Sequence, residues 1–323
     1  MLFEPLEVKG ITLRNRYVMP PMVNNMGVVT PQAIAFYRER AKGGVGLVIV
    51  EATHVDRFSD SWFVNGLQHL TKAIHDEGVA IAIQLFHNNI FDNEETNPTC
   101  ITKEQIARLK KKFVYAAQMA REASFDGVEP HGAHGFFLNQ FFSPERNKRT
   151  DEYGGSLENR MRMGIEIVQA IKENTDPEML MLYRHTPVSM GYTLEESIKF
   201  TMELEKAGVD IMDISPSTDS KGEHAGLAEA IKAKLDIPVI AVGGMNDPEK
   251  ARKALEDGKC DLVAVARGLI ADPYLPKKVM EGKLDEIVEC ILCNEKCFGN
   301  LNKGIPISCT QNPNAGREYL NNC

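Results

Sequence analysis

The sequence lacks the features that would direct it to nucleic acid, to a membrane or out of the cell. Its 323 residues carry a formal net charge of −8 and no run rich in Lys and Arg, so neither nucleic acid nor an anionic membrane is an expected partner. No apolar stretch reaches the about 18 residues of a membrane span. The first residues, MLFEPLEVKG, lack the basic and apolar regions of a signal peptide. We therefore expect a cytoplasmic protein.

The cysteines are few and unevenly placed. Of the seven, Cys100, Cys260 and Cys323 stand apart and are interpreted as ordinary thiols. The other four lie together near the end with the spacing C-x2-C-x3-C-x11-C: Cys290, Cys293, Cys297 and Cys309. A tight cluster in a cytoplasmic chain indicates a metal centre rather than disulfides. Four thiolates suit either Zn²⁺ or an iron–sulfur cluster, and the spacing alone leaves both open.

Short apolar runs alternate with helical stretches along most of the chain, which is typical of a parallel sheet with crossover helices. The expected strands are Tyr17–Pro20, Leu47–Glu51, Ala80–Leu85, Gly127–Glu129, Met179–Arg184, Ile211–Ile214, Val239–Val242 and Leu262–Val265. The expected helices are Gln32–Lys42, Gln68–Glu77, Lys103–Ala123, Leu157–Glu173, Leu194–Ala207, Ala225–Lys234 and Pro248–Asp257, with an eighth after Pro273. Eight such units favour an α/β fold of the closed (β/α)8, or TIM barrel, type. We expect residues 1–283 to form the barrel and residues 284–323 a short C-terminal cysteine-rich segment.

The last two strands are followed by the pattern of a phosphate site. Gly243 and Gly244 follow the seventh strand, and Ala266 and Arg267 follow the eighth. Loops at these two places commonly bind phosphate in such barrels through free backbone N–H groups and a helix N-terminus. Arg267 adds a positive charge. This predicts a phosphate-bearing ligand without saying which one.

Polar side chains also end the middle strands. His131 and His134 stand in an HGAH stretch after the fourth strand, where two imidazoles can hold an oxygen and stabilise negative charge on it. A metal site is the competing interpretation, but no third ligand is evident nearby. Gln84 can both donate and accept hydrogen bonds, or simply bind backbone. Arg184 ends an apolar strand, where a charge is costly unless it is paired.

The segment from Phe125 to Arg160, FDGVEPHGAHGFFLNQFFSPERNKRTDEYGGSLENR, closely resembles the signature of the old yellow enzyme family of FMN-dependent ene-reductases. The resemblance implies that His131 and His134 hold a substrate carbonyl while hydride passes from reduced FMN to the β-carbon of a conjugated C=C bond. It also implies a set of FMN contacts: Pro21, Met22, Val23, Ala52, Gln84, Arg184, Gly243, Gly244, Ala266 and Arg267.

Two positions depart from the family pattern. Val23 stands where the family usually has Thr or Cys, and because Val donates no hydrogen bond we expect a shifted flavin redox potential. Phe136 stands where the family typically has the Tyr that donates a proton to the α-carbon. The proton then comes from water, His134, His224 or another group, or alkene reduction is not the main reaction. Ser215 and His224 belong to the loop after the sixth strand, which contacts substrate in the family.

The cysteine segment resembles the [4Fe–4S] segment of the iron–sulfur branch of the same family, which includes 2,4-dienoyl-CoA reductase, 2-enoate reductase and trimethylamine dehydrogenase. This favours iron–sulfur over zinc. Relatives in that branch continue into a module that carries FAD and accepts NAD(P)H, whereas this sequence has no G-x-G-x-x-G segment after a strand. Electrons are therefore expected from NAD(P)H directly, or through the cluster from a separate subunit or carrier, unless the chain is a shortened one. No Cys precedes Cys100, so we expect non-covalent FMN.

Three hypotheses of function follow. The first is an FMN and [4Fe–4S] oxidoreductase that reduces an activated alkene, such as an enone or enoate. The second is an amine dehydrogenase or demethylase that passes electrons from a small-molecule substrate to the cluster. The third is a non-redox phosphate-binding barrel, such as a lyase or aldolase, with structural zinc, although no Schiff-base Lys is evident at the barrel mouth. The substrate, the electron donor, the direction and the oligomeric state, homo-oligomer included, stay open.

Overall fold

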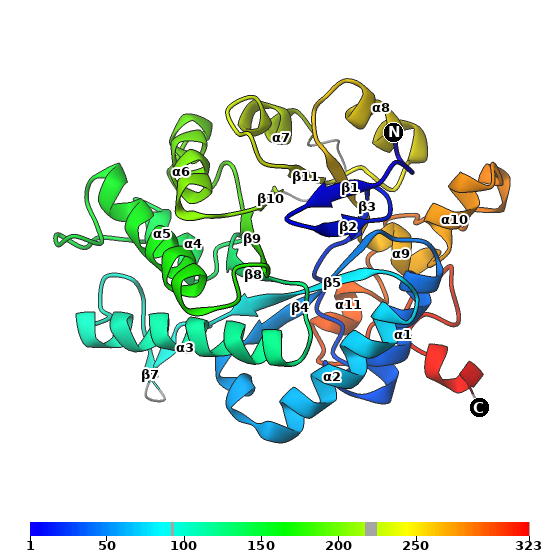
Figure 1. Ribbon diagram of the computed structural model, residues 1–323, viewed down its shortest axis with the longest axis horizontal. Helices are drawn as coiled ribbons and strands as arrows, with labels where there is room; N and C mark the ends of the chain where they lie inside the picture. The colour runs from blue at the N-terminus through cyan, green and yellow to red at the C-terminus, as the bar shows by residue number, and fades with distance from the viewer. Residues whose placement is uncertain (92–93, 217–224, 323) are drawn as a thin grey trace.

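A closed barrel of eight parallel strands forms the centre of the computed structural model, which describes residues 1–91, 94–216 and 225–322 (Figure 1). The barrel strands are β3 (Tyr17–Met19), β4 (Leu47–His54), β5 (Ala80–Phe86), β8 (Gly127–Gly132), β9 (Leu180–His185), β10 (Ile211–Ile214), β11 (Val239–Val242) and β12 (Leu262–Ala264). They pair in chain order, and β12 closes the ring by pairing with β3. The predicted (β/α)8 fold is confirmed.

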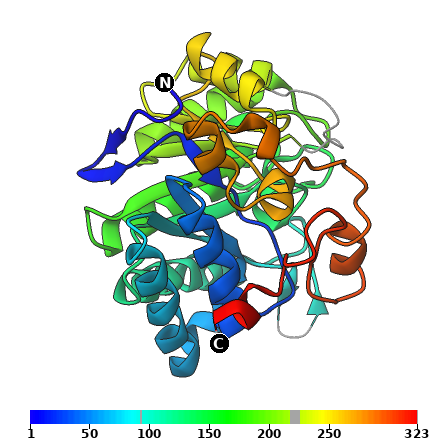
Figure 2. The same cartoon turned by 90° about the vertical axis from the view of Figure 1, so that its right-hand side faces the viewer.

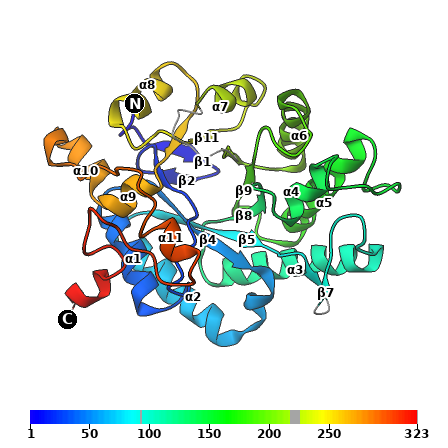
Figure 3. The ribbon, with the colours of Figure 1, turned by 180° about the vertical axis from the view of Figure 1, so that it is seen from behind.

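Helices surround this barrel, as the views from the two sides show (Figures 1 and 3). The longer ones are α1 (Pro31–Lys42), α2 (Ser61–His75), α3 (Lys103–Glu122), α5 (Leu157–Asn174), α6 (Leu194–Ala207), α7 (Ala225–Lys232) and α8 (Pro248–Glu256). Short helices are α4 (Phe137–Phe142), α9 (Arg267–Ala271), α10 (Leu275–Met280) and α11 (Phe298–Leu301), with 3-10 turns η1 (Val55–Ser59), η2 (Leu284–Glu286) and η3 (Glu318–Asn322). Within the described residues, no helix is long and apolar enough to cross a membrane.

Helix starts follow local sequence rules. Thr102 and Thr193 begin α3 and α6 with capping boxes, in which the threonine hydroxyl accepts from a backbone N–H and a Gln or Glu side chain accepts in return. Ser156 caps α5 by accepting from the backbone N–H of Asn159. These signals explain why the predicted bounds of α3, α5 and α6 agree closely with the observed ones, whereas α2 begins at Ser61, seven residues before the predicted Gln68.

An N-terminal hairpin closes one end of the barrel. Strands β1 (Leu6–Val8) and β2 (Ile11–Leu13) are joined by Lys9 and Gly10, which both have positive φ, 49° and 78°, as a tight hairpin turn requires. Val8 and Leu13 belong to a buried cluster that includes residues at the starts of the barrel strands, among them Leu47, Leu180 and Leu262. A second hairpin, β6 (Ile90–Phe91) with β7 (Glu94–Glu95), follows β5. The N-terminal hairpin does not cover the opposite end of the barrel, where the parallel strands terminate, and we call that end the open end.

Several strands run further than the sequence predicted. The fourth barrel strand, expected to end at Glu129, continues to Gly132, so His131 lies on the strand and only His134 lies in the turn. Strand β4 likewise continues past Glu51 to His54, and places Ala52 within it. The apolar pattern stops where polar side chains begin to face the barrel mouth, but the backbone pairing continues beyond that point.

The C-terminal segment, residues 284–322, packs back on the barrel at the loop after β3. Asn25 donates through Nδ2 to the carbonyls of Leu301 at 3.1 Å and Ile305 at 3.2 Å. The N–H of Ile307 donates to the carbonyl of Asn24 at 2.9 Å. Figure 2 shows the red end of the chain beside α1. The cysteine-bearing segment therefore lies against the loop predicted to bind flavin.

Candidate active site and cysteine centre

A layer of buried polar side chains lines the inside of the barrel near its open end. It draws one or two residues from each of four adjacent strands: Gln84, Glu129, His131, Arg184 and Asp213. Gln84 is paired in register with Glu129, and Arg184 with both His131 and Asp213. Side chains paired in this way face the same side of a sheet. The structure thus brings Gln84, His131 and Arg184 together in one layer.

The two predicted histidines lie edge to face. Their ring centroids are 5.3 Å apart at an interplanar angle of 87°. The N–H of Ala133 donates to Nδ1 of His131 at 3.3 Å, so the ring hydrogen of neutral His131 lies on Nε2. Burial, with the nearby His134 and Arg184, holds the pKa of His131 well below its ordinary value. Desolvation and Arg184 also lower the pKa of His134. Both rings are neutral near pH 7, and each has one N–H to donate.

Arg184 holds the centre of this polar layer. Its Nη2 donates to Oγ of Ser215 at 3.0 Å, and its Nε lies 3.3 Å from Oδ2 of Asp213. Its Nη1 lies 3.4 Å from the carbonyl oxygen of Pro21, the first predicted flavin contact. The guanidinium therefore reaches from β9 to the loop after β3, with a buried carboxylate to balance its charge.

The interior contains polar atoms that lack partners. Oε2 of Glu129 and Oδ1 of Asp213 are buried without a hydrogen bond in the described part of the chain, and Nε of Arg184 and Oδ2 of Asp213 have only their mutual ion pair. A buried polar atom left unpaired costs about 1–3 kcal/mol. Buried polar atoms without hydrogen bonds indicate that a polar ligand or an ordered water molecule binds beside them. The pyrimidine edge of FMN, with its carbonyls and N–H, is chemically complementary to Arg184 and Gln84.

The predicted phosphate loops have backbone suited to an anion. Gly243 and Gly244 have φ values of 108° and 77°, in the left-handed region that favours glycine. Ala266 is the N-cap of α9, and Arg267 is its first residue. Consecutive backbone N–H groups in such turns, beside a helix start, form anion-binding concavities. The residues present thus fit both the ring and the phosphate of FMN.

Aromatic side chains form one wall of the barrel mouth. The Phe136 ring lies 4.8 Å from the ring of His131 and 4.9 Å from that of Phe86. Phe136 and Val23 are each 41% exposed, and they follow β8 and β3 at this end of the barrel. Met22 and Ala52 are half-buried at the same end of the barrel. The position next to His131 therefore carries a phenyl ring without a hydroxyl.

Arg267 is directed differently from the other predicted cofactor contacts. Its Nη1 donates to Oδ1 of Asn294 at 2.8 Å, and its side chain lines the pocket that holds the cysteines. It therefore lies at the junction between the barrel and the C-terminal segment. A phosphate contact by Arg267 stays a prediction.

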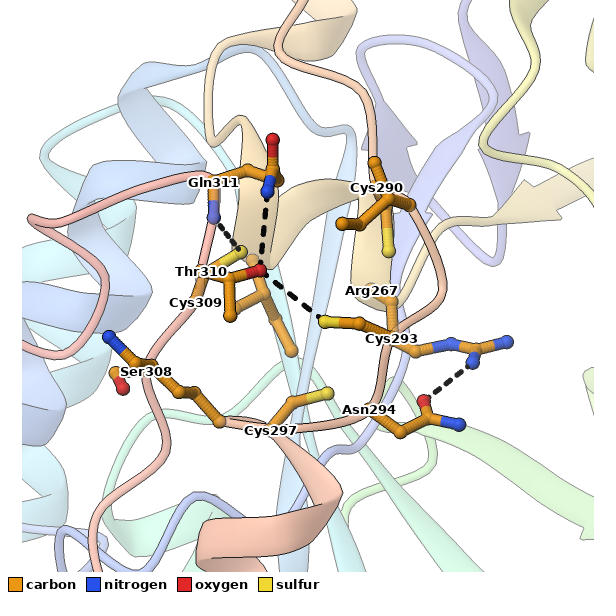
Figure 4. A pocket seen from close by; sticks show the side chains of 12 residues that line it. Arg267, Cys290, Cys293, Asn294, Cys297, Ser308, Cys309, Thr310 and Gln311 are labelled. Atoms are coloured by element: carbon orange, nitrogen blue, oxygen red, sulfur yellow. Dashed lines mark hydrogen bonds between the residues drawn. The ribbon is translucent and has the colours of Figure 1, made fainter.

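The four predicted metal ligands line a single pocket (Figure 4). The sulfur atoms of Cys290, Cys293, Cys297 and Cys309 face a common space. The N–H of Gln311 donates to Sγ of Cys309 at 3.4 Å, and Oγ1 of Thr310 lies 3.3 Å from Sγ of Cys293. Hydrogen bonds of this kind stabilise anionic sulfur. Cys323 lies outside the described residues.

The spacing of the sulfurs tests the two metal alternatives. A tetrahedral zinc with Zn–S bonds of about 2.3 Å puts its sulfurs only about 3.8 Å apart. In the described residues, His54, Asp56 and His87 form the one set of three or more potential ligands whose atoms all lie within 4.8 Å of one another. No three cysteine sulfurs of the described residues meet that limit. The four thiols are therefore not drawn together as closely as the sulfurs around a single zinc ion.

Sequence reasoning missed the His54, Asp56 and His87 group. The signal was present, because His54 and Asp56 follow the second strand and His87 the third. However, Nζ of Lys112 lies 2.9 Å from Oδ1 of Asp56, so a cation already neutralises this carboxylate. We therefore interpret the group as a structural cluster. His224, one of the alternative proton sources expected from the sequence, lies outside the described residues.

Comparison with known proteins gives the family. Residues 1–100 and 88–286 match the NADH:flavin oxidoreductase / NADH oxidase family. The chain belongs to this family. The match includes the strands that carry Gln84, His131 and Arg184. Because this is a family of flavin-dependent oxidoreductases, the hypothesis of a non-redox lyase or aldolase barrel is no longer supported.

Relatives extend the likeness through the cysteine segment. The chain is 38% identical to an NADH oxidase of Thermoanaerobacter brockii, covering 98% of this chain and 56% of that protein. It is 31% identical to a cinnamate reductase of Clostridium sporogenes, covering 98% and 58%. The chain thus spans little more than half the length of these curated relatives.

Solved structures also resemble nearly the whole of this chain. A 2-naphthoyl-CoA reductase complex with 2-naphthoyl-CoA superposes with a TM-score of 0.91 at 28% identity, covering 98% of this chain and 58% of that one. A histamine dehydrogenase from Rhizobium sp. 4-9 superposes with a TM-score of 0.90 at 30% identity, covering 98% and 53%. A 2-naphthoyl-CoA reductase and a histamine dehydrogenase are therefore both among its structural neighbours.

Proposed function

We propose that this chain binds FMN and reduces an alkene conjugated to a carbonyl, carboxylate or thioester group. The observation that carries the proposal is the pair of neutral imidazoles, His131 and His134, at the barrel mouth beside Arg184. FMN, when bound, supplies the hydride for such a reaction. The cinnamate reductase and 2-naphthoyl-CoA reductase relatives support this substrate class.

His131 and His134 hold the substrate oxygen. Neutral imidazoles donate hydrogen bonds without adding charge to the ground state. Their N–H groups stabilise the negative charge that develops on the oxygen as the β-carbon is reduced. The buried position of His131 strengthens this interaction, because little water competes for the oxygen.

Proton delivery to the α-carbon is assigned to a group other than Phe136. The phenyl ring stands against His131 and has no proton to give. Its exposure leaves the mouth open to water. Water at this wall is therefore the proposed proton source, and His134 is the alternative.

Gln84, Arg184, Ala52 and the loop Pro21–Val23 are proposed to hold the flavin ring, and the turns at Gly243–Gly244 and Ala266 its phosphate. The four cysteines are proposed to hold a [4Fe–4S] cluster. The pocket that they share and the hydrogen bonds to their sulfurs support this assignment. Electrons would come from NAD(P)H or from a separate protein carrier.

Amine oxidation is the second candidate. Two observations favour it: Phe136 removes the usual proton donor for alkene reduction, and histamine dehydrogenase is a close structural neighbour. In this direction electrons would leave the substrate for the flavin and then the cluster.

A paired substrate screen separates the two. The anaerobic protein is given enones, enoates and aryl enoates with a reductant, and amines with an artificial electron acceptor. Alkene reduction that falls about 100-fold or more in His131→Ala, with partial recovery in His131→Asn, supports the proposal. Amine oxidation without alkene reduction would replace it with the second candidate.

A further inference from the structure

The hydroxyl of Ser215 connects two residues of the candidate active site. Its Oγ lies 3.0 Å from Nη2 of Arg184 and 2.9 Å from Nε2 of His134. Ser215 follows β10 and is buried, with 3% of its surface exposed. Neither interaction was predicted from the sequence, which placed Ser215 only in a loop near the substrate.

Chemistry fixes the direction of one of these two contacts, and the direction of the other depends on the tautomer of His134. A guanidinium only donates, so Oγ of Ser215 accepts from Arg184. The serine hydrogen is then free to be donated, and the second neighbour of Oγ is Nε2 of His134. If Nε2 accepts, neutral His134 carries its ring hydrogen on Nδ1. Nδ1 has no hydrogen-bond partner within the described residues.

The backbone at His134 is held in place by residues that follow β9 and β10. His134 has a φ of 58°, in the left-handed region that non-glycine residues rarely adopt. Its N–H donates to Oγ1 of Thr186 at 3.0 Å, and that hydroxyl donates to the carbonyl of Ser215 at 3.0 Å. Both the backbone and the ring of His134 are therefore fixed relative to residue 215.

We propose that Ser215 is a positioning residue that sets the tautomer of His134, so that Nδ1–H is the group offered to the substrate oxygen. The substrate part of this proposal rests on the proposed function. Ser215 does not touch the substrate in this account. It acts through His134, and Arg184 fixes the direction of its hydroxyl.

Replacement of Ser215 by alanine removes the donor to Nε2. Arg184 keeps its contact with Asp213, so its charge stays paired. The ring hydrogen of His134 is then free to move to Nε2, which leaves Nδ1 as an acceptor facing the substrate oxygen. An acceptor cannot bind a carbonyl, and the loss of one such hydrogen bond corresponds to about a tenfold loss in kcat/KM.

The direct test is the ¹⁵N spectrum of histidine-labelled protein, with His134 assigned by the signal that disappears in His134→Gln. Nδ1 of His134 protonated in the wild-type protein and Nε2 protonated in Ser215→Ala is the expected result. Nε2 protonated already in the wild-type protein, or the same tautomer in both, would overturn the proposal. This readout does not require turnover, so it stands even if the proposed substrates are wrong.

A matched serine–histidine pair provides the control. Oγ of Ser197 lies 2.9 Å from Nε2 of His185, in a buried contact between α6 and β9. Ser197→Ala should alter the His185 signals and leave kcat/KM unchanged. Ser215→Thr, which keeps the hydroxyl, should restore the wild-type tautomer of His134 and most of kcat/KM. Equal kinetic losses in Ser215→Ala and Ser197→Ala would indicate a general packing effect and contradict the proposal.

Discussion

The carboxamide nitrogen of Gln84 donates a 2.7 Å hydrogen bond to Oε1 of Glu129 inside the barrel. With its nitrogen engaged there, Gln84 has its oxygen available to accept from the N–H of a bound flavin. Glu129 thus decides which end of Gln84 is presented. This pairing joins two adjacent strands, β5 and β8, at the level where the cofactor is expected.

Removal of the Gln84 carboxamide should weaken FMN binding. In Gln84→Leu the dissociation constant of FMN should rise about tenfold, the equivalent of one lost hydrogen bond. Arg184→Met should have a larger effect, because a charged donor is lost. Flavin fluorescence on addition of FMN to apoprotein measures both, with the exposed Arg252→Ala as control. Unchanged FMN affinity in both variants would remove these residues from the flavin site.

Glu129→Gln should change how stability depends on pH. Burial, then the charge of Asp213, raises the pKa of Glu129 from 4.5 to about 8. Between these values the folded protein keeps a proton that the unfolded chain has released, so stability falls as pH rises through this window. Gln has no proton to lose, so the variant should show a smaller fall in Tm from pH 5 to pH 8. Glu195→Gln, at an exposed site, should follow the wild-type curve, and a Glu129→Gln curve parallel to both would contradict the assignment.

Phe136→Tyr should speed alkene reduction. The introduced hydroxyl would lie next to His131, where the phenyl ring now packs at 4.8 Å. General acid catalysis typically contributes about 10²–10⁴-fold, so kcat should rise at least tenfold if proton transfer limits the wild-type rate. Phe86→Tyr, in the same aromatic wall, is the control. No gain, together with undiminished amine oxidation, would favour the second candidate function.

Cys293→Ser should lose the cluster and keep the barrel. The expected preparation contains less than half the wild-type iron, while FMN content and the far-ultraviolet spectrum are unchanged. Cys100→Ser, an exposed cysteine outside the pocket, should keep all its iron. If Cys293→Ser loses zinc and not iron, the iron–sulfur assignment is wrong.

The barrel could be predicted from the sequence because its strands are buried on both faces and appear as apolar runs between capped helices. The C-terminal ends of the strands, which carry the candidate site residues, were predicted less well. His131 was placed in a turn because Glu129 interrupts the apolar pattern, yet β8 continues through both residues. The polar layer is buried by its pairing with other strands, which a single sequence does not reveal.

The direction of the side chains was the second feature that the sequence could not predict. Gln84 and Arg184 could be assigned from a strand end and a family resemblance. The contact of Arg267 with Asn294 joins residues 27 positions apart, and that of Ser215 with His134 joins residues 81 apart. Neither leaves a local pattern. Short helices such as α4 and α9 were also missed, because five or six residues are too few to show a helical period.

The measurement that tests the central claim most directly is anaerobic reduction of the purified protein, followed by visible absorbance, with iron and zinc assayed on the same sample. The account predicts a flavin spectrum that bleaches with NADH or NADPH, about four irons per chain, and reoxidation of the flavin when an enoate is added. Bleaching by dithionite alone would indicate that a partner supplies the electrons. Zinc without flavin would contradict the account.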